Sequence, residues 1–337
     1  HMNIYSQSEI TIFFKKINKL KIFVVGDAML DLYWYGNIER ISPEAPVPIV
    51  HITHKETRLG GAANVALNCV AMGAEVYLLS TIGKDEQGKQ MKSLLEEKNI
   101  LTNFLLQSVD RITTTKTRVI AKNQQTIRID DEIVSHLNVK DEHHFIDTCL
   151  RAIQIEKPDI VIFEDYNKGL LSENMIEKII THCKHVGVMT SVDPKLENFF
   201  AYKHVDIFKP NLKEVRDAFN IKLEKIDIKN LKKIHTLLFQ KLQHHNTIIT
   251  LSEKGIFVHN DKNASLIPTH IRTIADVSGA GDTVISVASI LFFLTKNLTF
   301  AAQIANIAGG LVCEQVGVVA INKTKLLREI LQVNQTN

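Results

Sequence analysis

Short apolar runs alternate with amphipathic stretches along most of the chain. Lys21–Gly26 (KIFVVG) is an apolar run that ends in glycine, which is typical of a buried strand. Similar runs predict strands at Val76–Ile82, Ile160–Glu164, Gly187–Val192, Ile207–Lys209, Thr247–Leu251 and Ile256–His259. Helical periodicity separates them, over Gln87–Lys98, Ser172–Cys183, Asn211–Phe219 and Ile228–Leu242. These repeated strand–helix units predict a doubly wound α/β fold, with a mainly parallel central sheet and helices on both faces.

Two segments interrupt this rhythm and predict a second, smaller sheet. From Thr113 to Asp131 the residues alternate on either side of a polar turn at Lys122-Asn123-Gln124, which is the pattern of a β-hairpin. Tyr33–Arg58 is polar, aromatic and dotted with prolines, so we expect only short strands there, at an edge or in an irregular sheet. We expect segments 32–58 and 112–132 to form a small β-sheet that projects from the main body.

Composition and charge narrow the class of protein. The 337 residues suit one large α/β unit, and we expect a single domain over 1–337, with His1-Met2 as a remnant of cloning. A net charge of +3 argues against nucleic acid or an anionic membrane as partner. No apolar span of about 18 residues and no signal peptide is present, so we expect a cytoplasmic protein. The four cysteines are far apart, which favours reduced, buried thiols over zinc or disulfides.

Glycine is scarce, with 15 residues, and its clusters mark places where the backbone turns sharply or approaches something closely. Gly83–Gln90 (GKDEQGKQ) nearly fits the phosphate loop GxxxxGK[ST]. Gln90 stands where that loop needs a hydroxyl, and Asp85 and Glu86 would lie inside the phosphate cradle. We therefore interpret this stretch as a strand-to-helix turn.

Asp276–Thr283 (DVSGAGDT) is a stronger candidate because an apolar, small-residue stretch follows it. Its glycines would lie at a helix N-terminus, where free N–H groups and the helix dipole attract anions. Asp282 would lie in the first turn, beside that anion site. From local features alone a helix cap and a catalytic base are equally good explanations. Asp276, at the other end, would shape the turn or support a nearby cation.

Polar residues follow several predicted strands, and ligands of parallel sheets bind beyond the carboxyl ends of strands. The candidate clusters are Asp27/Asp31, Glu164/Asp165, Asp193/Lys195, Asn211/Glu214 and Thr250/Ser252. Gly60-Gly61 followed by Asn64 suits either a tight turn or a polyol site. Asn211 and Glu214 form a capping pattern that would equally help to hold magnesium and phosphate. The histidine pairs at 143–144 and 244–245 are interpreted as surface residues.

These motifs together resemble the two signatures of the ribokinase-like (PfkB) family of carbohydrate kinases. Gly60–Gly88 matches the first signature and Asp276–Thr283 the second, and the resemblance extends from about residue 20 to 330. Within the family the chain is most similar to the D-glycero-β-D-manno-heptose-7-phosphate kinases. That similarity is carried by Val25–Gly36 (VGDAMLDLYWYG), Arg40–Pro48 (RISPEAPVP), Asn123-Gln124-Gln125, Arg128-Ile129-Asp130 and Asp165–Gly169 (DYNKG). Many such kinases are fused to a nucleotidyltransferase, but no HxGH motif is present, so we expect a free-standing kinase.

The resemblance implies ATP- and Mg²⁺-dependent phosphorylation of a sugar phosphate at its anomeric hydroxyl, giving a 1,7-bisphosphate; a monovalent cation is a further candidate ligand. It implies that Asp282 takes the proton from the C1 hydroxyl, while the amides of Gly279, Ala280 and Gly281 stabilise the phosphoryl group in transfer. The implied sugar contacts are Asp27, Asp31, Gly60, Gly61, Asn64 and Asp193. The implied nucleotide contacts are Asn211, Glu214, Thr250, Ser252, Gly255, Val277, Asn306 and Gly310, of which Asn211 and Glu214 would also support magnesium through water.

The 7-phosphate of such a substrate needs a cation, because burying a dianion without one is costly. The candidates are Arg118, Lys122, Arg128 and Lys168. Three of them lie on or beside the predicted hairpin, so the projecting sheet would act as a lid that excludes water. The family often pairs such lids between subunits, which implies a homodimer.

Two other interpretations stay open. One is another kinase of the same family, acting on fructose phosphate, ribose or a nucleoside. The second is a catalytically silent regulator that binds a sugar or nucleotide, which the intact Asp282 and glycine loop disfavour.

Overall fold

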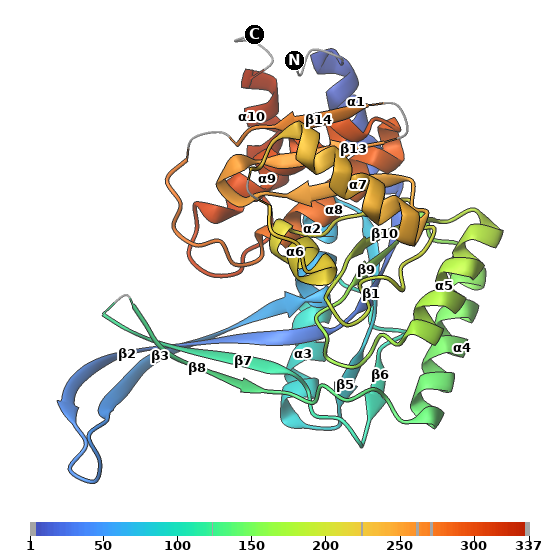
Figure 1. Ribbon diagram of the computed structural model, residues 1–337. Helices are drawn as coiled ribbons and strands as arrows, with labels where there is room; N and C mark the ends of the chain where they lie inside the picture. Colours follow the sequence, from blue (N-terminus) through green and yellow to red (C-terminus); the bar gives the residue numbers. More distant parts are fainter. Residues whose placement is uncertain (1–4, 123, 224, 261–262, 270–271, 334–337) are drawn as a thin grey trace.

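The chain folds around one large sheet, with a long, narrow sheet projecting from it (Figure 1). The structure is a computed structural model that describes residues 5–122, 124–223, 225–260, 263–269 and 272–333. His1, Met2 and Asn123, which belong to sequence predictions above, lie outside these described residues.

The large sheet has eight strands, in the order β14-β13-β12-β11-β10-β9-β1-β4. All neighbours are parallel except β12–β13 and β13–β14. The predicted mainly parallel sheet is thus confirmed. Its strands are β1 (Lys21–Gly26), β4 (Glu75–Leu79), β9 (Ile160–Glu164), β10 (Met189–Asp193), β11 (Ile207–Phe208), β12 (Asn246–Thr250), β13 (Ile256–His259) and β14 (Ala264–Ile267).

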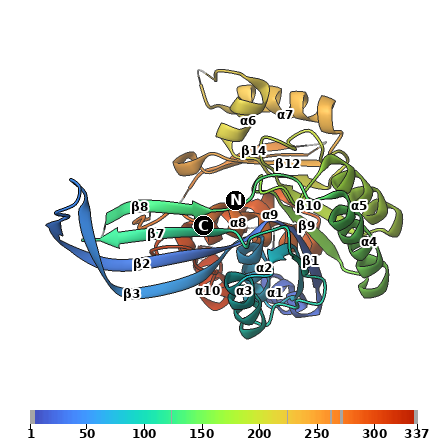
Figure 2. The same cartoon turned by 90° about the horizontal axis from the view of Figure 1, so that it is seen from below.

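Helices cover both faces of this sheet, as the apolar strand runs predict (Figure 2). Alternate residues of β1 supply two separate cores, because side chains of a strand point to opposite faces: Ile22 and Val24 join one core, Phe23 and Val25 the other. The first core is covered by α1 (Gln7–Lys16), α2 (Ala62–Met72), α3 (Glu86–Glu97), α8 (Ala280–Thr295), α9 (Leu298–Cys313) and α10 (Lys323–Val333). The second is covered by α4 (Val139–Glu156), α5 (Glu173–Val186), α6 (Leu212–Phe219) and α7 (Ile228–Leu242). Short 3₁₀ helices occupy Ile17–Lys19 and Ser252–Lys254.

The projecting sheet is larger than the sequence predicts. It contains β2 (Ala28–Ile41), β3 (Pro48–Gly61), β7 (Thr115–Ala121) and β8 (Gln124–Asp131), in the order β3-β2-β7-β8. The hairpin is confirmed, but the expectation of short, irregular strands before residue 58 is wrong, since β2 and β3 are 14 residues each. The buried residues of both strands gather at one end, Ala28 to Tyr33 in β2 and Leu59 to Gly61 in β3, so neither strand shows the alternation of a half-buried strand. Pro48 is compatible with pairing because it opens an edge strand.

Two smaller predictions also need correction. The strand predicted at Val76–Ile82 is interrupted at Ser80, giving β4 and then β5 (Thr81–Gly83), which pairs with β6 (Leu106–Ser108). The Ser80 hydroxyl donates to the Gly26 carbonyl at 2.6 Å and accepts from the Ala28 N–H at 3.1 Å. His244 is buried, contrary to the surface interpretation, because its ring packs near Phe208 and bonds the Thr247 hydroxyl. Burial and the neighbouring histidines lower the pKa of His244 to about 3.

The cysteines and the helices bear on two expectations drawn from composition. All four cysteines are buried, as predicted. Within the described part of the chain, none of the helices combines the length and apolar character that a bilayer span requires.

The stretch that mimics a phosphate loop is a strand-to-helix turn, as predicted. Asp85 is the N-cap of α3 and accepts a hydrogen bond from the Gly88 N–H at 2.7 Å. Its other oxygen accepts from the Thr113 N–H at 2.7 Å, which fixes the backbone just before β7. The carboxylate is therefore used structurally, joining the main body to the projecting sheet.

Replacing Asp85 with alanine is expected to lower the free energy of unfolding by about 2 kcal/mol. Loss of the cap accounts for about 1 kcal/mol, and the unpaired Thr113 N–H for a similar amount. Urea unfolding followed by circular dichroism measures the change. Glu86→Ala, at the exposed next position, is the control and should stay within about 0.5 kcal/mol of the wild type. Equal stability of the two variants would contradict the assignment.

Candidate active site

Three neighbouring strands end in line at the carboxyl edge of the large sheet. Gly26 of β1 is in register with Glu164 of β9, and Glu164 with Asp193 of β10. Lys209 comes directly after β11, whose Phe208 is in register with Val192. The polar side chains at these ends are therefore brought together by strand pairing alone. Gly26 is required beside them, because a Cβ there would lie 1.9 Å from the Glu164 carbonyl oxygen.

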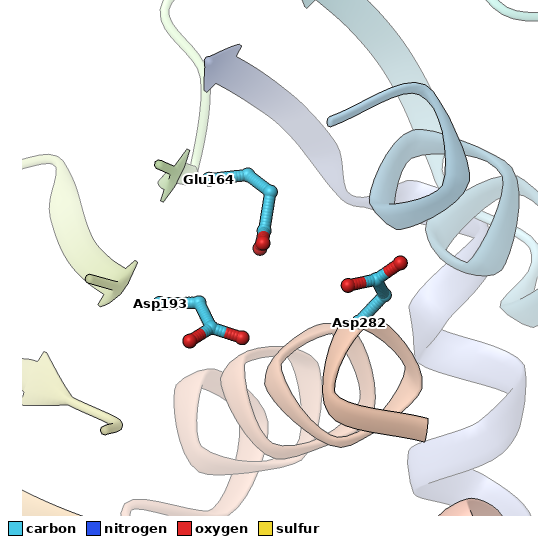
Figure 3. A group of neighbouring side chains, drawn as sticks. All are labelled: Glu164, Asp193 and Asp282. Atoms are coloured by element: carbon cyan, nitrogen blue, oxygen red, sulfur yellow. The ribbon is translucent and has the colours of Figure 1, made fainter. Parts of the chain in front are cut away.

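Asp282 reaches the same place from the opposite side, from the first turn of α8 (Figure 3). One oxygen from each of Glu164, Asp193 and Asp282 lies within 4.8 Å of the others. All three side chains are buried, so their charges need compensation. The Lys209 ammonium lies 2.8 Å from Asp193 and supplies it. Burial alone would lower the pKa of Lys209, but the attraction of Asp193 and Glu214 outweighs it and raises that pKa.

The Asp282 carboxylate is held at both of its oxygens. Asn64 of α2 donates to Oδ2 at 2.7 Å, and the Tyr166 hydroxyl donates to Oδ1 at 2.9 Å. Burial raises the pKa of Asp282 to about 6; the Asn64 bond opposes that rise, Asp193 adds to it, and the Tyr166 bond opposes it. Asp282 is thus a buried carboxyl group whose pKa lies close to neutral pH, which is the range of a general base.

Glu164 has a different environment. It is fully buried, and within the described residues neither carboxylate oxygen has a hydrogen-bond partner. Burial, followed by repulsion from Asp193 and Asp282, raises its pKa well above the usual value. These surroundings favour protonation of Glu164, and its oxygens face the shared space in Figure 3.

The glycine turn before α8 has the geometry expected of an anion site, with one exception. Gly279 is the N-cap residue with φ of +77°, and the first N–H groups of a helix lack intrahelical partners. A Cβ on Gly281 would lie 3.5 Å from Asp193 and 3.7 Å from the Lys209 ammonium, so the turn lies against this ion pair. The Ala280 N–H, however, donates to the Val277 carbonyl at 3.3 Å and is already engaged.

Asp276 shapes this turn, one of the two roles that the sequence left open. Its carboxylate accepts from the Ser278 N–H and from the Gly317 N–H, both at 2.9 Å. The 316–318 turn is also tied to the projecting sheet, since Arg58 donates to the Val316 carbonyl at 2.9 Å. The glycine turn and the projecting sheet therefore share one support.

Four of the six predicted sugar contacts, Asp27, Asp31, Gly60 and Gly61, lie where β2 begins and β3 ends. Asp31 lies in β2 and is paired with Arg118 of β7 at 2.5 Å. Gly60 is close by, because a Cβ there would lie 2.1 Å from an Asp31 carboxylate oxygen. Gly61, with φ of +58°, caps α2. Asp27 accepts hydrogen bonds from three backbone N–H groups of the loop after β9, those of Tyr166, Lys168 and Leu170, which favours a structural use of that carboxylate.

The four candidate cations have different surroundings. Arg118 lies at Asp31, and Lys168 lies on the loop held by Asp27, with its ammonium 2.8 Å from Glu132. Lys122 is exposed at the far end of β7, roughly 20 Å along the strand from Thr115 at about 3.3 Å per residue. Arg128 is exposed on β8, where it is the cross-strand partner of Arg118, and it is paired with Asp130. Arg128 therefore lies beside Arg118, whereas Lys122 lies far along the projecting sheet.

The predicted nucleotide contacts lie beyond Asp193, along the same edge of the sheet. Asn211 and Glu214 form a reciprocal capping box at the start of α6, and Glu214 is also paired with Lys195 at 2.5 Å. Asn211 forms an isolated bridge with Thr250 at the end of β12. Ser252 and Gly255 follow in a turn with φ of +54° and +92°, respectively.

Three further nucleotide predictions have different surroundings. Val277 is 69% exposed on the glycine turn. Asn306 of α9 donates to the Pro268 carbonyl at 2.9 Å. Gly310, one turn later, lies against Arg272, whose Nε would be 2.6 Å from an added Cβ. Asn306 and Gly310 therefore share a helix face that contacts Pro268 and Arg272.

Sequence reasoning assigned no role to four residues of this centre: Glu164, Tyr166, Lys195 and Lys209. The sequence indicates Glu164 and Lys195 only as polar residues near strand ends, and Tyr166 only within DYNKG. Lys209 closes an apolar run, where a lone charge is itself a signal because lysine is rarely buried without a partner. Taken together, the site offers a buried base, a helix N-terminus and a lysine-compensated acid cluster, which suits proton removal beside an anion.

Comparisons with known proteins agree with this chemistry. The sequence is 37% identical over 318 residues to "Bifunctional protein HldE" of Helicobacter pylori (strain HPAG1), covering 94% of this chain and 67% of that protein. It is 36% identical over 323 residues to the protein of the same name from Citrifermentans bemidjiense, covering 96% and 66%. The chain thus spans about two thirds of the length of these relatives.

Solved structures share the fold at low sequence identity. The tetrameric inhibited form of phosphofructokinase-2 from Escherichia coli superimposes with a TM-score of 0.76 at 16% identity, over 94% of this chain and 99% of that one. Arabidopsis thaliana ribokinase complexed with ribose and ATP gives 0.70 at 16% identity, over 93% and 99%. Both likenesses indicate a ribokinase-like architecture.

The family assignment rests on most of the chain. The pattern described as "pfkB family carbohydrate kinase" matches residues 19–325. Membership implies a nucleotide and a divalent metal as partners of the reaction. With relatives at 37% identity over nearly the full chain, the protein belongs to the pfkB family of carbohydrate kinases and is a phosphotransferase.

Proposed function

We propose that this protein is a cytoplasmic kinase that transfers the γ-phosphoryl group of ATP to the C1 hydroxyl of D-glycero-β-D-manno-heptose 7-phosphate. The products would be the 1,7-bisphosphate and ADP, in the synthesis of ADP-heptose for the lipopolysaccharide inner core. The observation that carries the kinase chemistry is the buried Asp282, held by Asn64 and Tyr166 at the N-terminus of α8. The heptose substrate is supported by the resemblance in VGDAMLDLYWYG, RISPEAPVP and DYNKG, and by the HldE relatives.

In this proposal Asp282 accepts the proton of the C1 hydroxyl as that oxygen bonds to phosphorus. The turn of Gly279, Ala280 and Gly281 directs the N-terminal end of α8 at the charge that develops on the phosphoryl oxygens, with Gly281 beside Lys209. Because the Ala280 N–H is engaged, we assign the larger share to the amide of Gly281 and to the helix dipole. Bound ATP and its divalent metal would supply the phosphoryl group and neutralise its charge.

The residues proposed for the nucleotide and Mg²⁺ fit an indirect contact with the metal. Glu214 uses one carboxylate oxygen for the Asn211 N–H at 2.8 Å and the other for Lys195. With both oxygens engaged, Glu214 would support the metal through water rather than as a direct ligand. Thr250 and the turn of Ser252 and Gly255 lie next along the sheet edge, where we place the nucleotide, with Val277, Asn306 and Gly310 on its far side.

A related kinase acting on fructose phosphate, ribose or a nucleoside is the main alternative. Arg118 and Lys168 at the sugar side favour a phosphorylated substrate. ADP release measured across phosphorylated and free heptoses and hexoses distinguishes the candidates. We expect the heptose 7-phosphate to give the highest kcat/KM, whereas a higher value for any other substrate would displace the proposal. No ADP release with any of them would indicate the non-catalytic regulator.

The general-base assignment predicts that Asp282→Asn loses at least ~100-fold in kcat, the usual scale for this type of catalysis. Nucleotide binding should remain, because asparagine keeps the size of the side chain and the proposed nucleotide contacts come from other residues. Coupled ADP-release assays measure kcat, and calorimetry measures the nucleotide Kd. Near-wild-type turnover would remove Asp282 from the mechanism.

The phosphate-binding assignment predicts that Lys168→Met raises KM for the sugar phosphate about tenfold, the value of one charge-assisted hydrogen bond. KM for ATP should not change, because Lys168 lies on the sugar side of Asp282. Lys178→Met, on the exposed face of α5, is the matched control. An equal loss with an unphosphorylated sugar would show that Lys168 does not bind the phosphate.

We also propose a homodimer formed through the projecting sheet. Ile127 and Ile129 of its edge strand β8 are 54% and 48% exposed, and an exposed apolar edge is prone to pairing. Sedimentation velocity should give twice the chain mass for the wild type. The double variant Ile127→Lys/Ile129→Lys should sediment as a monomer, and a wild-type monomer at micromolar concentration would refute the proposal.

A further inference from the structure

The loop that follows β9 connects the proposed base to the projecting sheet. It contains Asp165 to Leu170 and passes between Asp27 and Asp282. Its first side chain after Asp165 is Tyr166, the residue that bonds Asp282 Oδ1. The family resemblance implies no role for this tyrosine, but its hydrogen bond to Asp282 indicates one.

Tyr166 and Asn64 divide the Asp282 carboxylate between them. Each donates to a different oxygen, at 2.9 Å and 2.7 Å. A carboxylate oxygen accepts about two hydrogen bonds, so one position on each oxygen is left for a substrate hydroxyl. Two donors on opposite oxygens also fix the rotation of the carboxylate plane, which a single donor would leave free.

Tyr166 is itself held at three points. Its backbone N–H donates to Asp27 Oδ2 at 2.9 Å. The Lys195 ammonium lies 5.1 Å from the centre of its ring. On another side the ring lies close to Gly61, where an added Cβ would be 3.5 Å from Cδ2. The hydroxyl is therefore placed by the backbone and the ring, rather than by its bond to Asp282.

The same loop is fastened to the end of β8. Arg111 donates to the carbonyls of Lys168 and Ile133, and the Lys168 ammonium pairs with Glu132 at 2.8 Å. Gly169, with φ of +81°, passes so close to Ser135 that a Cβ would lie 2.0 Å from its carbonyl oxygen. The position of Tyr166 therefore depends on the strand that leaves the projecting sheet.

We propose that Tyr166 is a positioning residue for Asp282: its hydroxyl orients the carboxylate toward the substrate hydroxyl and favours the ionised form of the base. This inference rests on the proposed role of Asp282. Tyr166 acts through Asp282 and takes no part in bond making, so its removal should impair kcat more than KM.

The charges around Asp282 explain why such a donor is needed. Asp193 and Glu164 face it from β10 and β9, and Lys209 from the end of β11. Burial and the Asp193 charge favour the protonated acid, which cannot serve as a base. The two donors and Lys209 oppose them. The Tyr166 hydroxyl stays protonated at working pH, because burial and Asp282 raise its pKa well above the usual value.

The test is Tyr166→Phe, which removes only the hydroxyl. We expect kcat to fall about tenfold, since a misoriented base is costly, with KM for ATP and sugar phosphate within about twofold. The acidic limb of the kcat/KM profile should move to higher pH, because one donor to the ionised form is lost. The loss relative to wild type should therefore be about fivefold greater at pH 6 than at pH 9.

Tyr202→Phe is the matched control, because it also removes a buried hydroxyl, which donates to Asp165 at 2.6 Å. It should leave the acidic limb in place. An unmoved limb in Tyr166→Phe, or an equal movement in both variants, overturns the proposal. If Tyr166→Phe fails to fold, 3-fluorotyrosine at position 166 provides the second measurement: a stronger donor should move the limb to lower pH, and no movement overturns the proposal.

The experiments distinguish the role of Asp282 from the role of Tyr166. An active Asp282→Asn removes the proposed base and with it any role for Tyr166. An inactive Asp282→Asn together with wild-type kinetics of Tyr166→Phe leaves the kinase mechanism intact and overturns only the positioning role.

Discussion

The cost of burying carboxylates at the edge of the large sheet is the constraint on which the site depends. Glu164, Asp193 and Asp282 lie within a few ångströms of one another with almost no exposure, and three such charges cannot share a dry space unaided. The molecule meets this constraint in three ways. Lys209 pairs with Asp193, Asn64 and Tyr166 donate to Asp282, and the surroundings of Glu164 favour its neutral form. As a result Asp282 has a pKa close to neutral pH, and it lies beside the N-terminus of α8, which attracts an anion.

The fold produces this grouping through strand register. Each acid or lysine is near the end of an apolar strand, and parallel pairing aligns those ends without any direct contact being encoded locally. Asp282 comes from a helix packed across the sheet, so its approach depends on the small residues of α2 and α8 that allow close packing. This explains why glycines gather here in a chain that has few: Gly26, Gly60 and Gly279 each lie where a Cβ would meet a neighbour at 2.9 Å or less.

The sequence predicts a strand or helix well where a single pattern, an apolar run or a helical period, defines its limits. Bounded apolar runs place β1, β9 and β13, and helical periodicity places α7, with the same limits as the structure. The glycine turn and Asp282 are also found from local pattern. The long strands β2 and β3 are missed because their buried residues gather at one end and do not alternate as in a half-buried strand. Register and side-chain direction, which a single sequence does not specify, decide three further features. They are the burial of His244, the grouping of Glu164, Tyr166 and Lys209 around Asp282, and the pairing of Arg118 with Arg128 away from Lys122.

The projecting sheet touches both elements that flank Asp282, and this gives it a part in the site beyond covering it. On one side Arg58 of β3 binds the 316–318 turn, whose Gly317 is held by Asp276 at the start of the glycine turn. On the other side Lys168 pairs with Glu132, which directly follows β8, in the same loop that carries Tyr166. The sheet is therefore joined to the supports of both the glycine turn and Asp282. A substrate whose phosphate bound Lys168 would compete with Glu132 for it, and this competition would act on the same loop, Asp165 to Leu170, that places Tyr166 at Asp282.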